Sequence, residues 1–229
     1  MKLYLATGNE NKKREMRQIL ETPGSSIQIV IPKDEGIDFN PEETGTTFYE
    51  NSLIKARTLW NIVHCPVLAD DSGICVDALG GAPGVYSSRY AGPLAMQGMP
   101  DGRKVSQQEQ NRMLIDQLND AVAGGIDLEA GRRNGLFAQG ARSAHYTCSM
   151  VFYFGLDKFA IAEETMEGCI IERAEDQRGS GGFGYDPLFF LPEYGKTAAE
   201  LGAEEKNAIS DRGKAPRILM EILKKFAIF

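Results

Sequence analysis

Residues 3–20 read LYLATGNENKKREMRQIL, and this stretch sets the fold class. The apolar run Leu3–Ala6 predicts a short buried strand, which Thr7-Gly8 ends. Asn9 is a good N-cap for the segment that follows, in which Met16, Ile19 and Leu20 recur at helical spacing. A strand, a turn and a helix in immediate succession are typical of an α/β protein.

The same alternation continues along the chain. Thr47-Phe-Tyr-Glu50 is a capping box that begins a helix, and residues 94–145 are interpreted as an insertion with a helix at 108–118 and a hairpin of its own. We therefore predict a single α/β domain over residues 1–229 with a mixed sheet. The other expected elements are strands at 27–31, 67–69, 146–154, 159–167 and 170–173, and helices at 48–63 and from about Pro216.

Composition excludes several classes of protein. The net charge is −7, so the basic face of a nucleic-acid-binding protein is not expected, although a few clustered cations can hold a small phosphorylated ligand. No apolar run approaches the roughly 18 residues that span a bilayer, and the N-terminus does not resemble a signal peptide. No cysteine belongs to a C-x-x-C pair. We expect a cytoplasmic protein with no membrane or nucleic-acid partner, no disulfides and no zinc.

The first candidate site is Thr7-Gly8-Asn9-Glu10-Asn11-Lys12. A strand that ends in a glycine turn and a helix start presents free backbone N–H groups and a positive helix end, which suits phosphate. Lys12 in the first turn opposes the helix dipole, and an anionic ligand would explain it. The alternative is a solvent-facing lysine at an ordinary turn. The segment is not a Walker A loop, because no Gly-Lys-Ser or Gly-Lys-Thr ends it.

The second candidate is Asp70-Asp71-Ser72-Gly73, expected at the end of the short strand 67–69. Two adjacent carboxylates repel, so a buried position needs a cation nearby, and magnesium prefers such oxygen ligands. The alternative is a polar turn, which has the same composition. A serine nucleophile lacks support, because Ser72 lies in no nucleophile elbow and only two histidines are available as a base.

Three weaker signals accompany these two. Glu42 or Glu43 could complete a metal site, and Asn51 and Lys55 share one face of the capped helix, almost opposite its apolar stripe. The run 179–184 fits G-x-G-x-x-G by its letters, but no strand precedes it and no helix follows, so it is read as a glycine loop. That loop would place the aromatic rings of Phe183 and Tyr185 beside a base. The charged residues 205–214 are the third signal, with a solvated helix end as the alternative.

The order of the motifs is more specific than any one of them. TGN-x-x-K, EETG, F-x-E-N-x-x-x-K-A, ADDSG, GGAPGVYSSRYAG, GGFGYDP-x-F and KTAAEL…EEKNAIS-x-RGKA together resemble the inosine/xanthosine triphosphate pyrophosphatase family. The resemblance runs from the N-terminus to about Leu219, apart from roughly 94–145. It implies an elongated fold of two lobes around a long mixed sheet, an active cleft between the lobes, and a homodimer.

The resemblance also implies an activity and its residues. The activity is magnesium-dependent hydrolysis of inosine, deoxyinosine and xanthosine triphosphates to monophosphate and pyrophosphate. Asp71 would be the general base and would bind magnesium with Glu42, while Asp70 and Glu43 would support them. The substrate residues would be Thr7, Gly8, Asn9, Glu10, Asn11 and Lys12 at the triphosphate, Asn51, Lys55 and Ser72 along the phosphates, and Phe183, Gly184, Tyr185, Asp186, Lys206, Asp211 and Arg212 at the nucleoside.

One motif departs from the family pattern. Asp211 stands where the family usually has histidine before the arginine, which leaves the base preference open. Two alternatives also remain open: a nucleotide sensor that binds without turnover, and a pyrophosphatase that prefers modified pyrimidine nucleotides.

Overall fold

The computed structural model describes residues 2–21, 24, 26–99, 101–133, 135–136, 138–182 and 184–225. These residues form two compact units. Unit 1 comprises the described residues of Met1–Ser72, Thr147–Glu164 and Asn207–Phe229, and unit 2 those of Gly73–Tyr146 and Thr165–Lys206. The described part of the chain contains no helix that is both long and apolar enough to cross a membrane.

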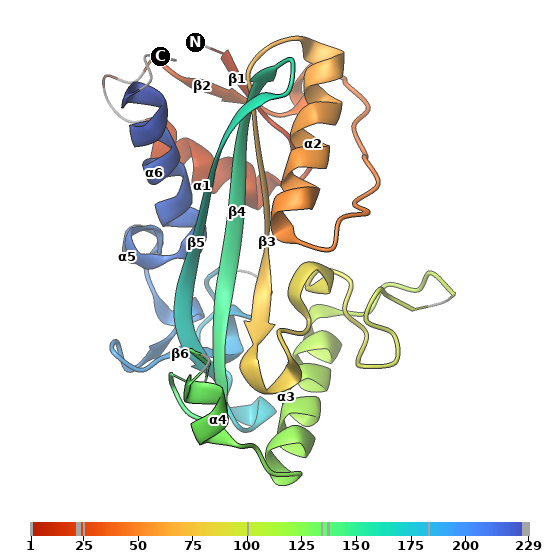
Figure 1. The fold of residues 1–229 in the computed structure, drawn as a ribbon, viewed down its shortest axis with the longest axis vertical. Helices are drawn as coiled ribbons and strands as arrows, with labels where there is room; N and C mark the ends of the chain where they lie inside the picture. Colours follow the sequence, from red (N-terminus) through yellow and green to blue (C-terminus); the bar gives the residue numbers. More distant parts are fainter. Residues whose placement is uncertain are drawn as a thin grey trace. The chain divides into compact units, whose positions relative to one another are not determined.

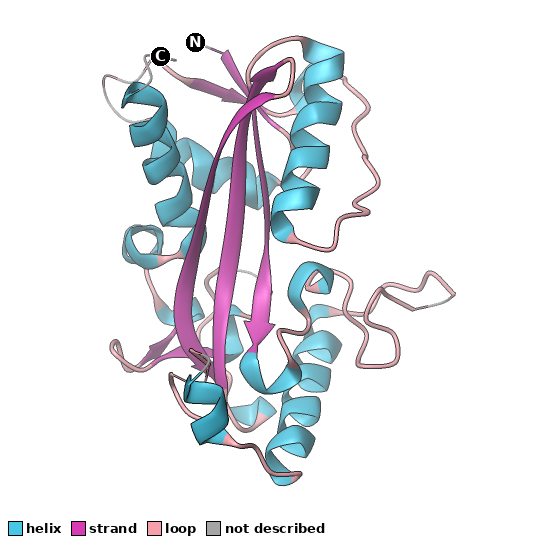
Figure 2. Ribbon diagram, in the orientation of Figure 1, coloured by secondary structure: helices cyan, strands magenta, loops and turns pink. Residues whose placement is uncertain are grey.

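Strands and helices alternate in the first part of the chain, whereas successive strands and then successive helices make up its last part. Figure 2 distinguishes the two kinds of element by colour. The strands are β1 Lys2–Leu5, β2 Gln28–Val30, β3 Val67–Val76, β4 Ser143–Gly155, β5 Lys158–Ile170, β6 Phe189–Leu191 and β7 Lys196–Thr197. The helices are α1 Glu10–Leu20, α2 Phe48–Val63, α3 Gln107–Ala123, α4 Leu128–Arg133, α5 Ala203–Ile209 and α6 Asp211–Lys225, with short 3-10 turns between them.

One sheet takes the strand order β2-β1-β3-β4-β5-β6-β7. Strand β1 pairs in parallel with β2 and β3, whereas β6 is antiparallel to β5 and β7. The predicted α/β class with a mixed sheet is therefore confirmed. The cleft between two lobes stays a prediction.

Unit 1 has a hydrophobic core on each face of its strands. Leu3 and Leu5 of β1 pack with residues of α1 and α6, whereas Tyr4 and Ala6 pack with residues of α2. Side chains of a strand alternate between faces, so one short strand contributes to both cores. Figure 1 shows α2 on one side of the long strands and α1 with α6 on the other. These helices carry most of the residues predicted for the phosphates.

Caps and turns account for several boundaries. Asn9 caps α1 and Thr47 makes the predicted capping box with Glu50 at the start of α2. Strands β4 and β5 are joined by Leu156 and Asp157, which have φ values of 51° and 56°. Two successive residues with positive φ are typical of a type I′ hairpin turn, which accounts for the tight connection between the two strands.

Four boundaries differ from the sequence prediction. Strand β3 continues to Val76 instead of ending at Ala69, so Asp70-Asp71-Ser72-Gly73 lies inside a strand. The final helix begins at Asp211 and contains Pro216, although proline usually marks a helix start. Helix α4 occupies part of the region where a hairpin was expected, and Ile170 ends β5 instead of beginning another strand.

Gly155, the last residue of β4, should be intolerant of a side chain. Its φ is +103°, and an added Cβ would lie 2.8 Å from Cε2 of Trp60 on α2. We expect Gly155→Ala to lower the free energy of unfolding by about 2–4 kcal/mol, from backbone strain and overpacking together.

Urea unfolding of the purified variant measures this loss. Gly195→Ala is the matched control, because its φ is also positive but nothing lies within 4 Å of the added Cβ. An equal decrease in the free energy of unfolding in the two variants would show that contact between the new Cβ and Trp60 does not contribute to the loss of stability.

Candidate functional site

Several predicted residues of unit 1 contact the middle of β3, where two adjacent carboxylates are buried. Asp70 is 1% and Asp71 is 8% exposed. Because successive residues of a strand point to opposite faces, the two carboxylates project away from each other. Asp70 contacts residues from α1 and α6, whereas Asp71 contacts residues from α2. The strand geometry therefore reduces the repulsion between the two adjacent carboxylates. Each carboxylate pairs with cations from the helices on its own face of the strand.

Asp70 is neutralised by Lys12 and Arg212. Nζ of Lys12 lies 2.7 Å from Oδ2 of Asp70, and Nε of Arg212 lies 3.4 Å from the same oxygen. Burial alone would raise the pKa of the Asp70 carboxyl, but the charges of Lys12, Arg212 and Lys55 outweigh burial and hold this pKa well below its ordinary value. Asp70 is therefore an anion at neutral pH.

Arg212, near the start of α6, ties three elements together. Its Nη1 donates to Oε2 of Glu15 on α1, and its Nη2 donates to Oγ of Ser72 on β3. The donor–acceptor distance is 2.7 Å in both hydrogen bonds. Burial would lower the pKa of the guanidinium, but Asp70, Glu15 and Asp211 raise it above its ordinary value. The predicted residues Ser72, Asp211 and Arg212 thus lie in one largely buried network with Asp70.

Gly213 explains how α6 reaches this position. A Cβ at Gly213 would lie 2.7 Å from the carbonyl carbon of Asn207 on α5, closer than real Cβ atoms approach. The backbone of α6 can therefore lie against α5 only because residue 213 is glycine. This close approach follows immediately after Asp211 and Arg212, and it fixes the start of the helix that carries them.

The segment from Thr7 to Lys12 has a well-defined local structure. Oδ1 of Asn9 accepts from the N–H groups of Asn11 and Lys12 at 2.9 and 3.4 Å, and Oγ1 of Thr7 accepts from the N–H of Asn9 at 3.0 Å. These N–H groups were expected to be free, and the structure shows that side chains cap them. Lys12 has an anionic partner in Asp70, which accounts for a lysine in the first turn. Gly8 and Glu10 are exposed.

Asp71 is held by two donors from α2. Nζ of Lys55 lies 2.9 Å from Oδ1 of Asp71, and Nδ2 of Asn51 lies 3.1 Å from Oδ2. The same ammonium is 3.2 Å from Oε1 of Glu43. Burial would lower the pKa of Lys55, but Asp71, Asp70 and Glu43 raise it overall. Lys55 is therefore a buried cation that two carboxylates share.

Glu42, the predicted second metal ligand, is exposed, whereas its neighbour Glu43 contacts Lys55. No cluster of three or more His, Cys, Asp or Glu side chains within the described ranges is arranged to hold a metal ion. A site with one or two carboxylates needs no such cluster, because magnesium retains waters and substrate oxygens as ligands. The role of Glu42 stays a prediction.

Most residues predicted for the nucleoside belong to unit 2. Nζ of Lys206 lies 2.5 Å from Oδ2 of Asp186, and both side chains are largely buried. Gly182 has a φ of +70°, and a Cβ there would collide with the carboxylate of Asp186 and lie 3.1 Å from Nζ of Lys206. The glycine loop is therefore shaped to cover this ion pair. Gly184 also has positive φ, and Phe183 lies outside the described residues.

Tyr185 is buried within unit 2. Its side chain is buried, with 3% exposed, and its hydroxyl donates to the carbonyl of Ser87 over 2.9 Å. Burial raises the pKa of this phenol above its ordinary value. Little of the ring's face is accessible in this packing, and the place of Tyr185 beside a base stays a prediction.

Sequence reasoning missed two residues in this region. Glu15 pairs with Arg212, and it lies three residues after Lys12, a spacing that places both on one face of α1. Gly45 donates its N–H to Oδ1 of Asn51 over 2.8 Å. The helical spacing was a usable signal for Glu15, whereas nothing in the sequence connects Gly45 to Asn51.

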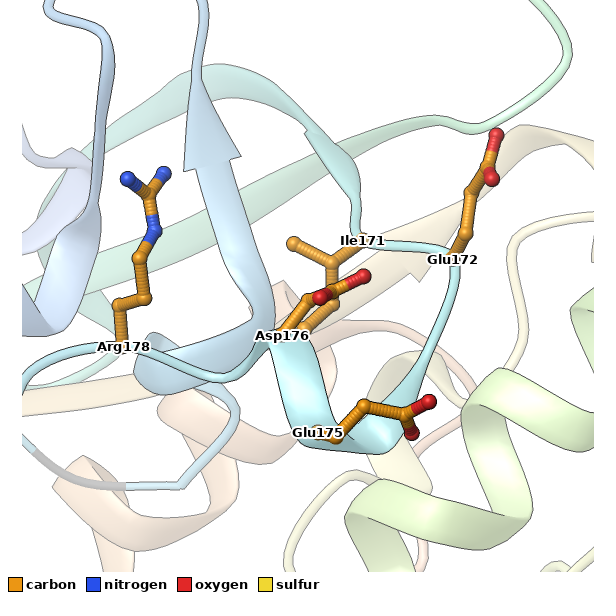
Figure 3. Close-up of a pocket in the computed structure, with 5 residues that line it drawn as sticks. All are labelled: Ile171, Glu172, Glu175, Asp176 and Arg178. Atoms are coloured by element: carbon orange, nitrogen blue, oxygen red, sulfur yellow. The ribbon is translucent and has the colours of Figure 1, made fainter.

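A separate surface depression lies in unit 2. It is lined by Ile171, Glu172, Glu175, Asp176 and Arg178 (Figure 3). None of these was predicted for the site. Two of its acidic side chains are paired with Arg173, Asp176 at 2.9 Å and Glu175 at 3.8 Å. The charged side chains that line this depression accordingly form ion pairs at the protein surface.

Comparison with known proteins identifies the family. The family model of the Ham1 family matches residues 3–222. The chain belongs to the Ham1 family. A protein of Treponema denticola named dITP/XTP pyrophosphatase is 47% identical over 215 residues, with 94% of each chain covered. The protein of the same name from Escherichia coli K12 is 38% identical over 225 residues, covering 97% of this chain and 98% of the other.

Solved structures agree with this assignment. A HAM1 protein from Coxiella burnetii has a TM-score of 0.77 at 33% identity, covering 98% of this chain and 99% of the other. The Ham1 protein of Staphylococcus aureus has a TM-score of 0.74 at 28% identity with the same coverage. The resemblance deduced from the order of the motifs is confirmed.

The charge of Asp70 should make a pH-dependent contribution to stability. Its pKa in the folded protein lies below the ordinary value of about 3.8. The carboxylate therefore stabilises the fold above that value, and this stabilisation is lost as the pH falls toward the lower, folded pKa. We expect Asp70→Asn to cost about 3–5 kcal/mol at pH 7, because two buried cations lose their partner, and to flatten the fall in stability below pH 4.

Urea unfolding at several pH values from 7 to 2.5 measures both effects. Asp38→Asn removes an exposed carboxylate and serves as the control. An Asp70→Asn protein whose stability keeps the original dependence on pH would contradict the assignment of this charge.

Proposed function

We propose that this protein hydrolyses inosine, deoxyinosine and xanthosine triphosphates to the monophosphate and pyrophosphate, and that the reaction requires magnesium. The observation that carries the proposal is the buried cluster of lysines, arginine and carboxylates around β3, in a chain 38–47% identical to proteins named dITP/XTP pyrophosphatase. Such hydrolysis would remove non-standard purine nucleotides from the nucleotide pool.

The carboxylates around Asp71 have the chemistry that magnesium requires. Asp71 and Glu43 already contact one cationic group, the ammonium of Lys55, so two hard oxygen donors lie near the same positive charge. Glu42, the ligand that the family resemblance implies, is adjacent to Glu43 in the chain. When bound, magnesium would neutralise phosphate charge and stabilise the leaving pyrophosphate.

We assign the remaining roles to residues of the same cluster. Lys12 and Lys55 are the cations for the phosphate oxygens, each held by a carboxylate. Each oxygen of Asp71 accepts one hydrogen bond, which leaves lone pairs that can orient a water and accept its proton. Asp70 maintains the position and charge of Lys12 and Arg212 and touches no reacting atom in this scheme.

On the family resemblance, the base is recognised by the Asp186–Lys206 pair of unit 2 and by residues at the start of α6 in unit 1. An ammonium fixed by a carboxylate can donate to a 6-oxo group and has nothing to accept from the 6-amino group of adenine. Asp211, which replaces the usual histidine, adds an acceptor in place of an imidazole. Selectivity for 6-oxo purines is part of the proposal.

The protein's surroundings and assembly are proposed on the family resemblance alone. We propose a cytoplasmic homodimer, for which analytical ultracentrifugation of the purified chain is the direct test. A nucleotide sensor and a pyrimidine-specific pyrophosphatase are the competing functions, and no described contact favours either over the purine pyrophosphatase.

A nucleotide panel tests the proposal. With saturating magnesium, inosine, deoxyinosine and xanthosine triphosphates should each release one pyrophosphate per monophosphate, while ATP reacts at least about a hundredfold less efficiently, as expected when a buried polar group loses its partner. GTP retains the 6-oxo group, and we expect it to be a poor substrate on the family resemblance alone. Ion chromatography of the products, with pyrophosphate and orthophosphate quantified separately, gives the answer. Binding without turnover would indicate the sensor, and stepwise release of orthophosphate would exclude pyrophosphate cleavage.

Asp71→Asn should remove most of this activity. Asparagine has nearly the same size but no negative charge for a metal ion or for a water proton, so kcat should fall about a hundredfold or more. Steady-state rates over a magnesium titration, with circular dichroism to verify the fold, measure the effect. Asp38→Asn is again the matched control, and near-normal turnover of Asp71→Asn at high magnesium would remove Asp71 from the reaction.

A further inference from the structure

Asn51 is completely buried on α2, with 0% exposed. Its carboxamide is held at both ends. Oδ1 accepts from the N–H of Gly45 at 2.8 Å, and Nδ2 donates to Oδ2 of Asp71 at 3.1 Å. A backbone N–H can only donate, so the atom that faces Gly45 must be the oxygen. The orientation of the amide is thereby fixed, and its N–H group necessarily points at Asp71.

Gly45 is also the residue that can approach so closely. A Cβ at position 45 would lie 2.7 Å from Oδ1 of Asn51 and 2.6 Å from Cβ of Glu50. The need for glycine here comes from this close contact, because the φ of Gly45 is not positive. The loop before α2 therefore reaches Asn51 through its backbone, and it reaches Lys55 through the side chain of Glu43.

The two donors on α2 fix both oxygens of one carboxylate. Asn51 and Lys55 are four residues apart, so they lie on the same helix face, and they bind Oδ2 and Oδ1 of Asp71 respectively. A carboxylate with a different donor on each oxygen cannot rotate about its last bond without breaking one contact. The geometry of Asp71 is thus set from α2 and from the loop that precedes it.

We infer that Asn51 is a positioning residue that orients Asp71, with the peptide N–H of Gly45 orienting Asn51 in turn. This differs from the expectation that Asn51 lines the path of the phosphates, because a side chain with no exposed surface does not touch substrate. The consequence for catalysis rests on the proposed function. The two hydrogen bonds that orient Asn51 and Asp71 form within the protein itself, so they can be tested in the absence of substrate.

Two substitutions of Asn51 test the inference in the full chain with saturating magnesium. Asn51→Ala removes the donor, and kcat for inosine triphosphate should fall about tenfold or more while KM changes less than about threefold, the pattern of an interaction that acts on the reacting group alone. Asn51→Asp retains the shape and an acceptor for Gly45 but has no N–H for Asp71, so its kcat should fall at least as far.

Ser52→Ala is the matched control. Ser52 is the next residue of α2, equally buried, and its Oγ donates to the carbonyl of Ser149 over 2.7 Å without contacting Asp71. It should lower the melting temperature and leave kcat and KM unchanged. The inference is overturned if Asn51→Ala raises KM tenfold at unchanged kcat, which indicates substrate contact, or if Asn51→Asp retains full kcat, which shows that the donor is unnecessary.

A measurement without substrate separates this inference from the proposed function. In the nitrogen-15 spectrum of the labelled protein, the side-chain amide of Asn51 is assigned as the signal lost in Asn51→Asp. Asp71→Ala should shift that signal, whereas Asp38→Asn should not. If no nucleotide is hydrolysed, the proposed function fails while this shift still tests the hydrogen bond. An Asn51 signal unaffected by Asp71→Ala would refute the inference itself.

Discussion

The alternation of side chains along β3 is the constraint on which the candidate site depends. It places Asp70 and Asp71 on opposite faces of one strand, so that two adjacent carboxylates can be buried without facing each other. Buried charges need partners, and each face must therefore bring its own. Lys12 and Arg212 come from α1 and α6 on one face, and Lys55 comes from α2 on the other.

The hydrophobic cores and the ion pairs of unit 1 are consequently both divided between the two faces of the strands. The helices that bury apolar residues against each face of the strands are the ones that supply the cations to that face. A disturbance of helix packing in unit 1 is thus also a disturbance of the charge balance around β3. Close backbone approaches at Gly45 and Gly213 reinforce this coupling, because each holds a charged or polar side chain through contacts that a larger residue would prevent.

Much of this was predictable from local sequence, and the failures have a common physical cause. Asn9, Thr47 and the apolar periodicity of α1 and α2 act over a few residues, and the sequence indicated them correctly. Asp-Asp-Ser-Gly was expected to end a strand, because its composition is that of a turn, yet β3 continues since distant residues neutralise its charges. The hydrogen bond from Tyr185 to Ser87 could not be predicted either, because the two residues are remote in sequence.

The strand also limits how the length of the gene product can vary. Inserting or deleting one residue in β3 ahead of Asp70 would exchange the faces of every side chain after it. Each carboxylate would then face the helix that holds the other one's partners, and any apolar residue of β3 between the change and Asp70 would also move to the opposite core. Codon gain or loss should therefore be rare within Val67–Ala69. Surface connections, such as the one that leads from the short turns after β3 to the start of α3, have no alternation of faces to preserve. Their length can therefore vary.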